Sequence, residues 1–367
     1  MGRLDLIKSL EAFLFRRIPS PMPTIKITGL GVAYPPTRVP TEEVNKGAYK
    51  FHESSPALDK VLALNRTSGI KTRSMVSFWD SPLLNQPTPP TIDEISKLFH
   101  SEGVKLTVSA ARAAIAEARV PVDAINYMIA STCTDSSSPG YDLLVARELG
   151  LRPDMERVLL HGVGCTGGLA GLRLAASLCH AAACRGGTAN ILVVACEIMT
   201  SGGRNELEII VRDQQIRAAP IIFGDGASAL MVSLDSKPHT GIFEIVHSAH
   251  LALPGTGDVL SVNVTPQGFR ETMSPELPAV ISSNIPVLYE NLLSSLPGSV
   301  RSILPAHPVN FDWPIHTSSM HFIDSAAKLM GIQRDDHLQA TWKVFQHYGN
   351  TSSASVFAVL DESRRVQ

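Results

Sequence analysis

The sequence predicts a layered α/β protein made of two related halves. Segments with the pattern of buried strands alternate with helical segments along most of the 367 residues, which is typical of a sheet covered by helices. The hydrophobic fraction of 44% is enough for a sizeable core, and the length suits two domains or one large two-part unit. From about Gly241 the order of elements is repeated, so we expect an internal duplication at the level of the fold.

The first half is expected to span residues 24–240. It begins with the strand TIKITGLGVAYP, and Thr41 then caps a helix. A Pro- and Ser-rich loop is predicted over 77–91, followed by two helical segments within 92–118. The stretch GGLAGLRLAASLCHAAAC is apolar almost all round and predicts a buried central helix. The further strands are predicted at 126–133, 157–163, 190–198 and, after a turn, within 221–234.

The second half is expected to span residues 241–367. It repeats the alternation of strands and helices, which again predicts a sheet with helical cover. The predicted elements are a strand in GIFEIVHSAHL, a helix in PAVISSNIPVLYENLLSSL, a strand in NFDWPIH, and helices in HFIDSAAKLMG and SSASVFAVLDESRR.

Residues 1–23 predict an amphipathic N-terminal helix and a linker. The charged residues that interrupt the apolar stretch, acidic ones among them, favour such a helix over a cleaved targeting peptide. It would pack on a partner subunit or lie on a membrane surface. The residues behind this prediction are an apolar face and two prolines that end it, namely Leu6, Leu10, Phe13, Leu14, Pro19 and Pro21.

Composition excludes several classes of partner. The formal net charge is −2, so nothing in the global charge favours nucleic acid, and no apolar run reaches the length of a membrane span. The five cysteines form no CxxC pair and the histidines form no HExxH motif, so we expect neither a metal site nor a disulfide framework. A reducing compartment, the cytoplasm, fits this cysteine usage.

The segment LLHGVGCTGGLAGLRLA indicates a nucleophile at Cys165. A strand ends in a glycine-rich turn, and the cysteine lies where the central helix begins, a position where unpaired N–H groups favour thiolate. Two alternatives stay open. Gly162, Gly164 and Gly167 also satisfy the GxGxxG dinucleotide pattern, although the first acidic residue after it is Glu197. The glycines would otherwise only let the helix pack tightly.

A thiolate nucleophile requires a histidine and a polar oxyanion partner nearby. His316 ends the strand NFDWPIH and is followed by small polar residues. Asn350 lies in HYGNTSSAS, a turn before a helix whose start is rich in Ser and Thr. Alone, each residue has an ordinary structural reading, as a strand-end histidine or a helix cap, and only the set of three indicates a catalytic site.

The sequence resembles a known family from about Thr24 to the last helix. The motifs GVGCTGGLAGLRLA, IIFGDGASALMV, FDWPIH and HYGNTSSASVFAVLDESRR have the order and spacing found in chalcone-synthase-like type III polyketide synthases, and the details are most similar to the fungal branch. The resemblance implies a thiolase fold of five αβαβα layers in a homodimer. It also implies acyl-CoA and malonyl-CoA as substrates, with no metal or organic cofactor.

The resemblance implies roles for individual residues. Cys165 would hold the starter and the growing chain as a thioester, and His316 would keep the thiolate ionised. His316 and Asn350 would stabilise the enolate formed when malonyl-CoA loses carbon dioxide. Repeated condensation would give a chain that cyclises to a pyrone or a resorcinol-type ring.

The resemblance also implies a substrate cavity and a coenzyme A site. Phe223 matches a gatekeeper phenylalanine, Glu271 stands where plant members have a second one, and Gly202 replaces a bulkier cavity residue. Asp225 is expected to build a turn. The residues in the position of the coenzyme A-binding bases are Lys60, Arg66, Lys71 and Arg73, although Ala63 and Thr67 replace two bases of plant members.

Two departures from the family pattern leave alternatives open. Thr317-Ser318-Ser319 replaces the usual Pro-Gly-Gly after the catalytic histidine, and the chain stops at Gln367, where the family continues into further strands and a Gly-Pro-Gly loop. We therefore expect an unpaired sheet edge in the second half. The alternatives are a catalytically inactive thiolase-fold protein and an initiation-type ketoacyl-carrier-protein synthase, which shares the Cys, His, Asn order.

Overall fold

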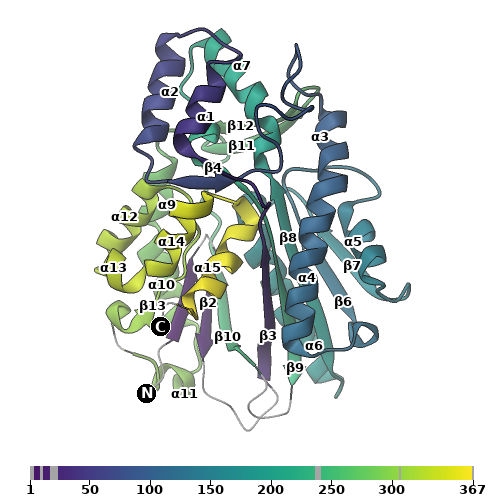
Figure 1. The fold of residues 1–367 in the computed structure, drawn as a ribbon. Helices are drawn as coiled ribbons and strands as arrows, with labels where there is room; N and C mark the ends of the chain where they lie inside the picture. Colours follow the sequence, from purple (N-terminus) through teal and green to yellow (C-terminus); the bar gives the residue numbers. More distant parts are fainter. Residues whose placement is uncertain (1–3, 9–10, 17–23, 236–240, 306, 366–367) are drawn as a thin grey trace.

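A computed structural model describes residues 4–8, 11–16, 24–235, 241–305 and 307–365, and its main feature is a mixed sheet of nine strands. The strand order is β13-β1-β2-β10-β3-β9-β8-β6-β7 (Figure 1). The strands are β1 (Leu4–Lys8), β2 (Glu11–Arg16), β3 (Thr24–Ala33), β4 (Arg38–Pro40), β5 (Thr72–Ser74), β6 (Tyr127–Ser131), β7 (Glu156–Leu160), β8 (Ala189–Ile198), β9 (Asp225–Asp235), β10 (Phe243–His250), β11 (Leu260–Thr265), β12 (Gly268–Met273) and β13 (Phe311–Asp312).

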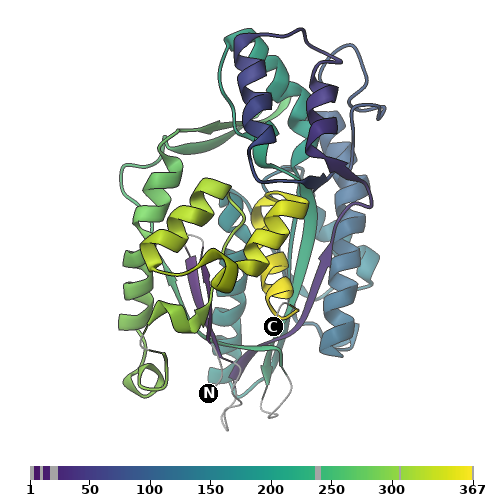
Figure 2. The same cartoon turned by 60° about the vertical axis from the view of Figure 1, so that its left-hand side comes forward.

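Helices cover both faces of this sheet and form a cap at one end of it. The helices are α1 (Thr41–Ala48), α2 (Pro56–Arg66), α3 (Ile92–Leu98), α4 (Val104–Ala118), α5 (Tyr141–Leu149), α6 (Gly167–Cys184), α7 (Gly203–Asp213), α8 (Ala219–Ile222), α9 (Leu277–Ser283), α10 (Ile285–Ser294), α11 (Gly298–Arg301), α12 (Met320–Met330), α13 (Arg334–His337), α14 (Gln339–Tyr348) and α15 (Ser355–Ser363). Figures 1 and 2 both show α1, α2 and α7 in the cap, beyond one end of the long strands.

The buried apolar side chains between the layers of the fold form three large clusters. Side chains of α4 and α5 pack on one face of the first-half strands, and α6 and α15 pack on the opposite face. Phe243 and Ile245 of β10 join the cluster of α6 and α15, whereas Val246 and Ala249 of β10 contact the cluster that contains α10 and α12. The layer order is therefore helices, first-half strands, α6 and α15, second-half strands, helices. The predicted αβαβα fold is confirmed.

The glycines of TIKITGLGVAYP let β3 lie directly on α4. A Cβ atom added to Gly29 would lie 2.0 Å from the main-chain oxygen of Ala114, and one added to Gly31 would lie 2.0 Å from that of Ala110. Real Cβ atoms do not approach an oxygen this closely, so any larger residue would push the helix from the sheet. The predicted strand, the loop over 77–91 and the buried central helix are all confirmed.

The predicted N-terminal helix is wrong for the described part of residues 1–23. Residues 4–8 and 11–16 are strands: β2 pairs antiparallel with β10, and β1 pairs with β2 and with β13. The pairing needs of β10 explain the difference, because a strand with free N–H and C=O groups stabilises a second strand more than a short isolated helix stabilises itself. Pro19 and Pro21, which were predicted to end this helix, lie outside the described residues. An unpaired sheet edge was expected in the second half; β10 is not such an edge, because it pairs with β2 on one side and with β3 on the other.

Other differences concern the second half. The helix predicted in PAVISSNIPVLYENLLSSL is two helices, α9 and α10, that meet at Asn284, next to Pro286, which cannot donate a helical hydrogen bond. The hairpin of β11 and β12 was not predicted. The strand predicted in NFDWPIH is only the two-residue β13, so His316 lies four residues beyond it. No helix in the described ranges is long and apolar enough to span a bilayer.

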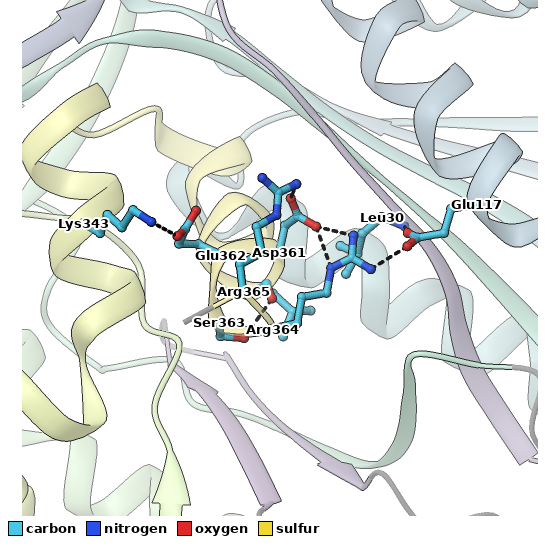
Figure 3. Close-up of polar contacts among 9 residues, drawn as sticks. Leu30, Glu117, Lys343, Asp361, Glu362, Ser363, Arg364 and Arg365 are labelled. Atoms are coloured by element: carbon cyan, nitrogen blue, oxygen red, sulfur yellow. Dashed lines mark hydrogen bonds and ion pairs between the residues drawn. The ribbon is translucent and has the colours of Figure 1, made fainter. Parts of the chain in front are cut away.

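A polar cluster fastens the last helix to the first half (Figure 3). Oε2 of Glu117 on α4 accepts a hydrogen bond from the main-chain N–H of Leu30 on β3 at 2.8 Å. Oε1 of the same carboxylate lies 2.6 Å from Nη1 of Arg364, whose Nε also donates to Asp361 at 2.8 Å. Because Glu117 contacts both β3 and the end of α15, it joins the outer helix layer to the central one.

Replacing Glu117 with alanine is expected to destabilise the fold by about 2 kcal/mol, since it leaves the Leu30 N–H without its acceptor and Arg364 without its partner. The urea midpoint of the purified protein measures this change. Glu102→Ala is the matched control, because Glu102 forms only an exposed ion pair with Lys105. Equal midpoints for the two variants would contradict the role assigned to Glu117.

Candidate active site

Cys165 lies where the strand–turn–helix motif was predicted to place it. It is the middle residue of a short 3-10 turn, Gly164–Thr166, that leads directly into α6. Gly162 and Gly164 have φ angles of 73° and 52°, which residues other than glycine rarely adopt. Close packing is not the reason for these two glycines, because a Cβ on either would meet no atom within 4 Å; at Gly168, in α6, a Cβ would lie 2.4 Å from the main-chain oxygen of Ser353.

The electrostatic environment of Cys165 differs from the prediction. Burial raises the pKa of its thiol to about 12, and the carboxylates of Glu271 and Glu197 act in the same direction. The hydroxyl of Ser352 opposes this effect by donating a hydrogen bond to the sulfur at 3.4 Å. The helix N-terminus was predicted to favour thiolate, but loss of hydration outweighs it. The resting form of Cys165 is therefore the neutral thiol.

His316 is buried, and its hydrogen bond defines its tautomer. Burial lowers the pKa of His316 to about 4, so the ring is neutral at physiological pH. Nδ1 lies 2.5 Å from Oγ of Ser355, and that hydroxyl donates its own hydrogen to the main-chain oxygen of Ser352 at 2.9 Å. Ser355 must therefore accept from Nδ1–H. The second ring nitrogen, Nε2, keeps a free lone pair that can take a proton.

Main-chain bonds hold Asn350 against the segment that carries Phe223. The Asn350 N–H donates to the Ile222 oxygen at 2.8 Å, and the Gly224 N–H donates to the Asn350 oxygen at 3.1 Å. Phe223 and Asn350 thus form a parallel bridge between the two halves of the chain. These main-chain bonds do not involve the side chain of Asn350.

A hydrogen-bond network centred on Ser352 joins the three predicted catalytic residues. Its N–H donates to Oδ1 of Asn350 at 2.8 Å, its hydroxyl donates to Cys165, and its carbonyl accepts from Ser355, the partner of His316. Ser352 has a φ of 48°, an unfavourable conformation for a residue with a side chain, and such strain is concentrated at functional sites. Neither serine was predicted individually, although the Ser-rich start of the last helix was the available signal.

The segment that replaces Pro-Gly-Gly after His316 forms an ordered connection. The hydroxyl of Thr317 donates to the Gly349 oxygen at 3.2 Å, which places this loop beside Asn350. The hydroxyl of Ser319 accepts from the Phe322 N–H at 3.2 Å and caps α12. Both contacts hold the segment that directly follows His316.

Cys165 opens into a largely apolar cavity. Phe223 and Gly202 line this cavity, as predicted from the family resemblance, and a side chain added at Gly202 would enter open space. His316 and Asn350 are not among its lining residues; Ser352, which contacts Cys165, is. The remaining lining residues are Val44, Arg73, Met75, Trp79, Ile95, Cys133, Thr134, Gly164, Ile198, Met199, Thr200, Ser201, Gly203, Glu206, Ala219, Pro220, Leu260, Val262, Phe269 and Glu271.

The predicted role of Arg73 in coenzyme A binding does not fit its position. Its side chain is buried, and its guanidinium donates to the main-chain oxygens of Pro220, Ile221 and Phe223 and to Oδ1 of Asn65. Burial lowers the pKa of Arg73 to about 10, which leaves it charged. Arg73 therefore holds the segment that carries Phe223.

The other three predicted bases are exposed. Lys60 and Arg66 lie on α2, and Lys71 lies at the start of the segment that leads into β5. Lys60 and Arg66 thus belong to the cap, which contains α2 (Figure 1). Their charges are available to an anionic ligand in solution.

A buried carboxylate, which was not predicted, lies behind the cavity. Glu197 is fully buried and accepts hydrogen bonds from the hydroxyl of Thr134 at 2.9 Å and from the N–H of Cys133 at 3.0 Å, and from the Ser353 hydroxyl. Burial raises the pKa of Glu197. Asp225 was predicted to build a turn; it is the first residue of β9, and its buried carboxylate accepts from the main-chain N–H groups of Val76 and Thr200, which belong to two other segments. In the described ranges, His, Cys, Asp and Glu form no group of three that could hold a metal.

Comparison with known proteins agrees with this architecture. Family models for the N-terminal and C-terminal domains of chalcone and stilbene synthases match residues 20–236 and 244–367. The type III polyketide synthase pspB of Penicillium soppii is 34% identical over 362 residues, which cover 94% of this chain and 91% of that protein. Acylalkylpyrone synthase csyB of Aspergillus oryzae is 30% identical over 348 residues, which cover 94% of this chain and 87% of that protein.

Solved structures agree as well. The type III pentaketide synthase from Neurospora crassa superposes with a TM-score of 0.89 and 40% identity, covering 93% of this chain and 90% of that one. The fungal type III polyketide synthase ORAS gives a TM-score of 0.87 and 39% identity, with the same coverage. The chain thus belongs to the chalcone and stilbene synthase family, as a type III polyketide synthase of the fungal kind.

Proposed function

We propose that the chain condenses malonyl-CoA repeatedly onto an acyl starter held on Cys165, and that the product cyclises to a pyrone or a resorcinol-type ring. The observation that carries this proposal is the Ser352 network, which joins Cys165 to Asn350 and His316 at the end of a large apolar cavity. Relatives named as an acylalkylpyrone synthase and a pentaketide synthase support a cyclised product of several extensions.

Loading of the starter requires a proton acceptor for Cys165. The thiol proton passes to the free Nε2 of His316, and the thiolate attacks the carbonyl carbon of the acyl-CoA. The thiolate of coenzyme A leaves and takes a proton from solvent, so His316 keeps the proton that it took from Cys165. Because both groups are neutral at rest, the ion pair forms only during the reaction. Ser352 favours it by donating a hydrogen bond to the sulfur.

Extension uses Asn350 and the protonated His316 as donors. Both donate hydrogen bonds to the thioester oxygen of malonyl-CoA, where negative charge develops as carbon dioxide leaves. The resulting enolate carbon attacks the thioester on Cys165 and displaces its sulfur, which takes the proton back from His316. The extended chain, now on coenzyme A, returns to Cys165 for the next cycle. Neither a metal nor an organic cofactor takes part in these steps.

Coenzyme A and a second subunit are the proposed partners. Lys60, Arg66 and Lys71 present exposed positive charges for the coenzyme A phosphates. The strand β7 is the last of the sheet and pairs only with β6, and its residue Val158 is exposed. We assign this edge to a homodimer contact. The cytoplasm is the proposed compartment, because all five cysteines are free thiols.

Incubation of the purified protein with labelled malonyl-CoA and a series of short to long acyl-CoA starters tests the function. We expect mass spectrometry to show products of two or more extensions. Products of a single extension would support the ketoacyl synthase alternative, particularly if a carrier protein replaces coenzyme A. Folded protein that gives neither product nor an acyl adduct would support the inactive thiolase-fold alternative.

Gly202→Leu is expected to shorten the range of accepted starters, because the new side chain would enter the open space of the cavity. The backbone φ of this residue is −82°, so leucine fits without strain. We expect the kcat/KM for long-chain starters to fall about tenfold or more, and that for short-chain starters to change little. Gly298→Leu, in open space outside the cavity lining, is the control. An equal fall for short and long starters would contradict the assignment of Gly202.

A further inference from the structure

The hairpin of β11 and β12 carries one carboxyl group on an otherwise apolar face. Leu260 and Val262 of β11, and Phe269 and Glu271 of β12, all line the cavity. These positions alternate along both strands, and Val262 lies directly opposite Glu271. Apolar residues are the ordinary choice for a face that lines a cavity. Leu260 and Val262 are partly exposed and Glu271 is half-buried, so the carboxyl group loses part of its hydration there. Glu271 therefore requires a chemical explanation.

The charged residues near Glu271 do not explain why a carboxyl group stands in the cavity wall. Arg217 forms a two-bond ion pair with the carboxylate of Glu206, one bond of which is 2.9 Å long. The same guanidinium donates to the main-chain oxygen of Glu271 and not to its carboxyl group. Among the described residues, none donates a hydrogen bond to the carboxyl oxygens of Glu271. Its hydrogen-bonding capacity is thus left for whatever occupies the cavity.

The protonation state of Glu271 restricts the kind of ligand. Loss of hydration, together with the nearby Glu206 carboxylate, raises the pKa of Glu271 to about 8, and Arg217 offsets this only in part. Below that pH the group is a neutral carboxylic acid with one O–H donor. A neutral acid of this kind binds a carbonyl oxygen, and it gives no charge attraction to a cationic ligand.

The group also lies close enough to Cys165 to influence it electrostatically, since the ionised carboxyl of Glu271 contributes to the raised pKa of that thiol. Both residues line the same cavity. A hydrocarbon starter on Cys165 offers the carboxyl group no acceptor, whereas each malonyl extension adds a keto oxygen to the chain.

We infer that the carboxyl group of Glu271 donates a hydrogen bond to a keto oxygen of the chain that grows on Cys165, and so favours further extension over early release. This inference rests on the proposed iterative condensation. Glu271 then acts as a specificity-determining residue, and the number of extensions is the quantity that it controls.

Product analysis of Glu271 variants of the full chain tests this role. The measured quantity is the ratio of products with two or more extensions to products with one, from one acyl-CoA starter, between pH 6.5 and 9.5. Starter loading is measured separately as the acyl adduct on Cys165. Glu271→Gln keeps the shape and a donor but cannot ionise, Glu271→Leu removes the donor, and Thr272→Ala, at the next, exposed position of β12, is the control.

We expect Glu271→Leu to lower the ratio about fivefold to tenfold at pH 7 with unchanged loading of Cys165, because one hydrogen bond to the chain is lost. In the unmodified chain the ratio should fall as the pH rises through 8, where the carboxyl group loses its proton. In Glu271→Gln it should stay constant over this range, and Thr272→Ala should behave like the unmodified chain.

Three results would overturn the inference and leave the function intact. One is an unchanged ratio in Glu271→Leu, and the other is a loss of loading confined to amine-bearing starters, which would make Glu271 a charge partner for the starter. A fall with pH that persists in Glu271→Gln would also overturn it. If the unmodified chain forms no extended product at any pH, the proposed function fails, and the inference fails with it.

Discussion

Cys165→Ala is expected to remove polyketide formation, with a fall in the rate of product formation of at least about 10⁴-fold. Covalent attachment divides the condensation into loading and extension, and no extension can occur on a chain that is not held. Cys133 lines the same cavity, and its sulfur lies 3.4 Å from the Ser352 hydroxyl, so it is the candidate to replace the nucleophile. We expect that it cannot, because burial and the Glu197 carboxylate raise its pKa well above the usual value.

The measurement is product formation together with the mass of the intact protein after incubation with an acyl-CoA starter. The unmodified chain should gain one acyl group, and Cys165→Ala should gain none. Cys184→Ala is the matched control, because Cys184 is exposed at the end of α6. An acyl adduct of normal yield in Cys165→Ala would show that another residue is the nucleophile.

Asn350→Ala is expected to lower the decarboxylation of malonyl-CoA by about 10²–10³-fold, the usual effect of removing one oxyanion donor. Loading of Cys165 should continue, since the amide acts on the malonyl thioester. The main-chain bonds of Asn350 with Ile222 and Gly224 do not use the side chain, so the local fold should persist. Release of carbon dioxide and formation of the acyl adduct are measured in parallel.

Two further variants separate the donor from the rest of the side chain. Asn350→Asp keeps an acceptor for the Ser352 N–H and removes the amide donor, so it should also lose decarboxylation. Ser318→Ala is the control, because Asn350 donates only to the main-chain oxygen of Ser318, at 3.3 Å. Equal loss of loading and of decarboxylation in Asn350→Ala would contradict a role confined to the enolate.

The local part of the architecture could be predicted from the sequence. The strand–glycine–cysteine–helix order places Cys165 because every step of it depends on neighbours in the chain. His316 and Asn350 were found as members of motifs, although β13 ends before His316. The long-range part could not be predicted. Residues 4–8 and 11–16 form strands because β10 and β13 are beside them, and the sequence of these short segments carries no information about residues about 230 or more positions away.

The remaining differences between the sequence-based predictions and the structure come from the burial of side chains in the folded protein. Arg73 stands in a cluster of bases, and the sequence does not reveal that its guanidinium turns inward to three main-chain oxygens. The pKa of Cys165 follows from lost hydration, which depends on the whole fold. Ser352 and Ser355 look like ordinary residues at a helix start, and their role depends on the strained backbone at Ser352.

The backbone bridge between Phe223 and Asn350 has a consequence for how such an enzyme can evolve. The position of Asn350, to which we assign decarboxylation, depends on main-chain bonds, which survive almost any exchange of side chains in the cavity wall. Phe223, Gly202 and Glu271 can therefore drift through mutation and give new products, while the chemistry of carbon–carbon bond formation is inherited unchanged. Diversification of products within a lineage would then require few simultaneous substitutions.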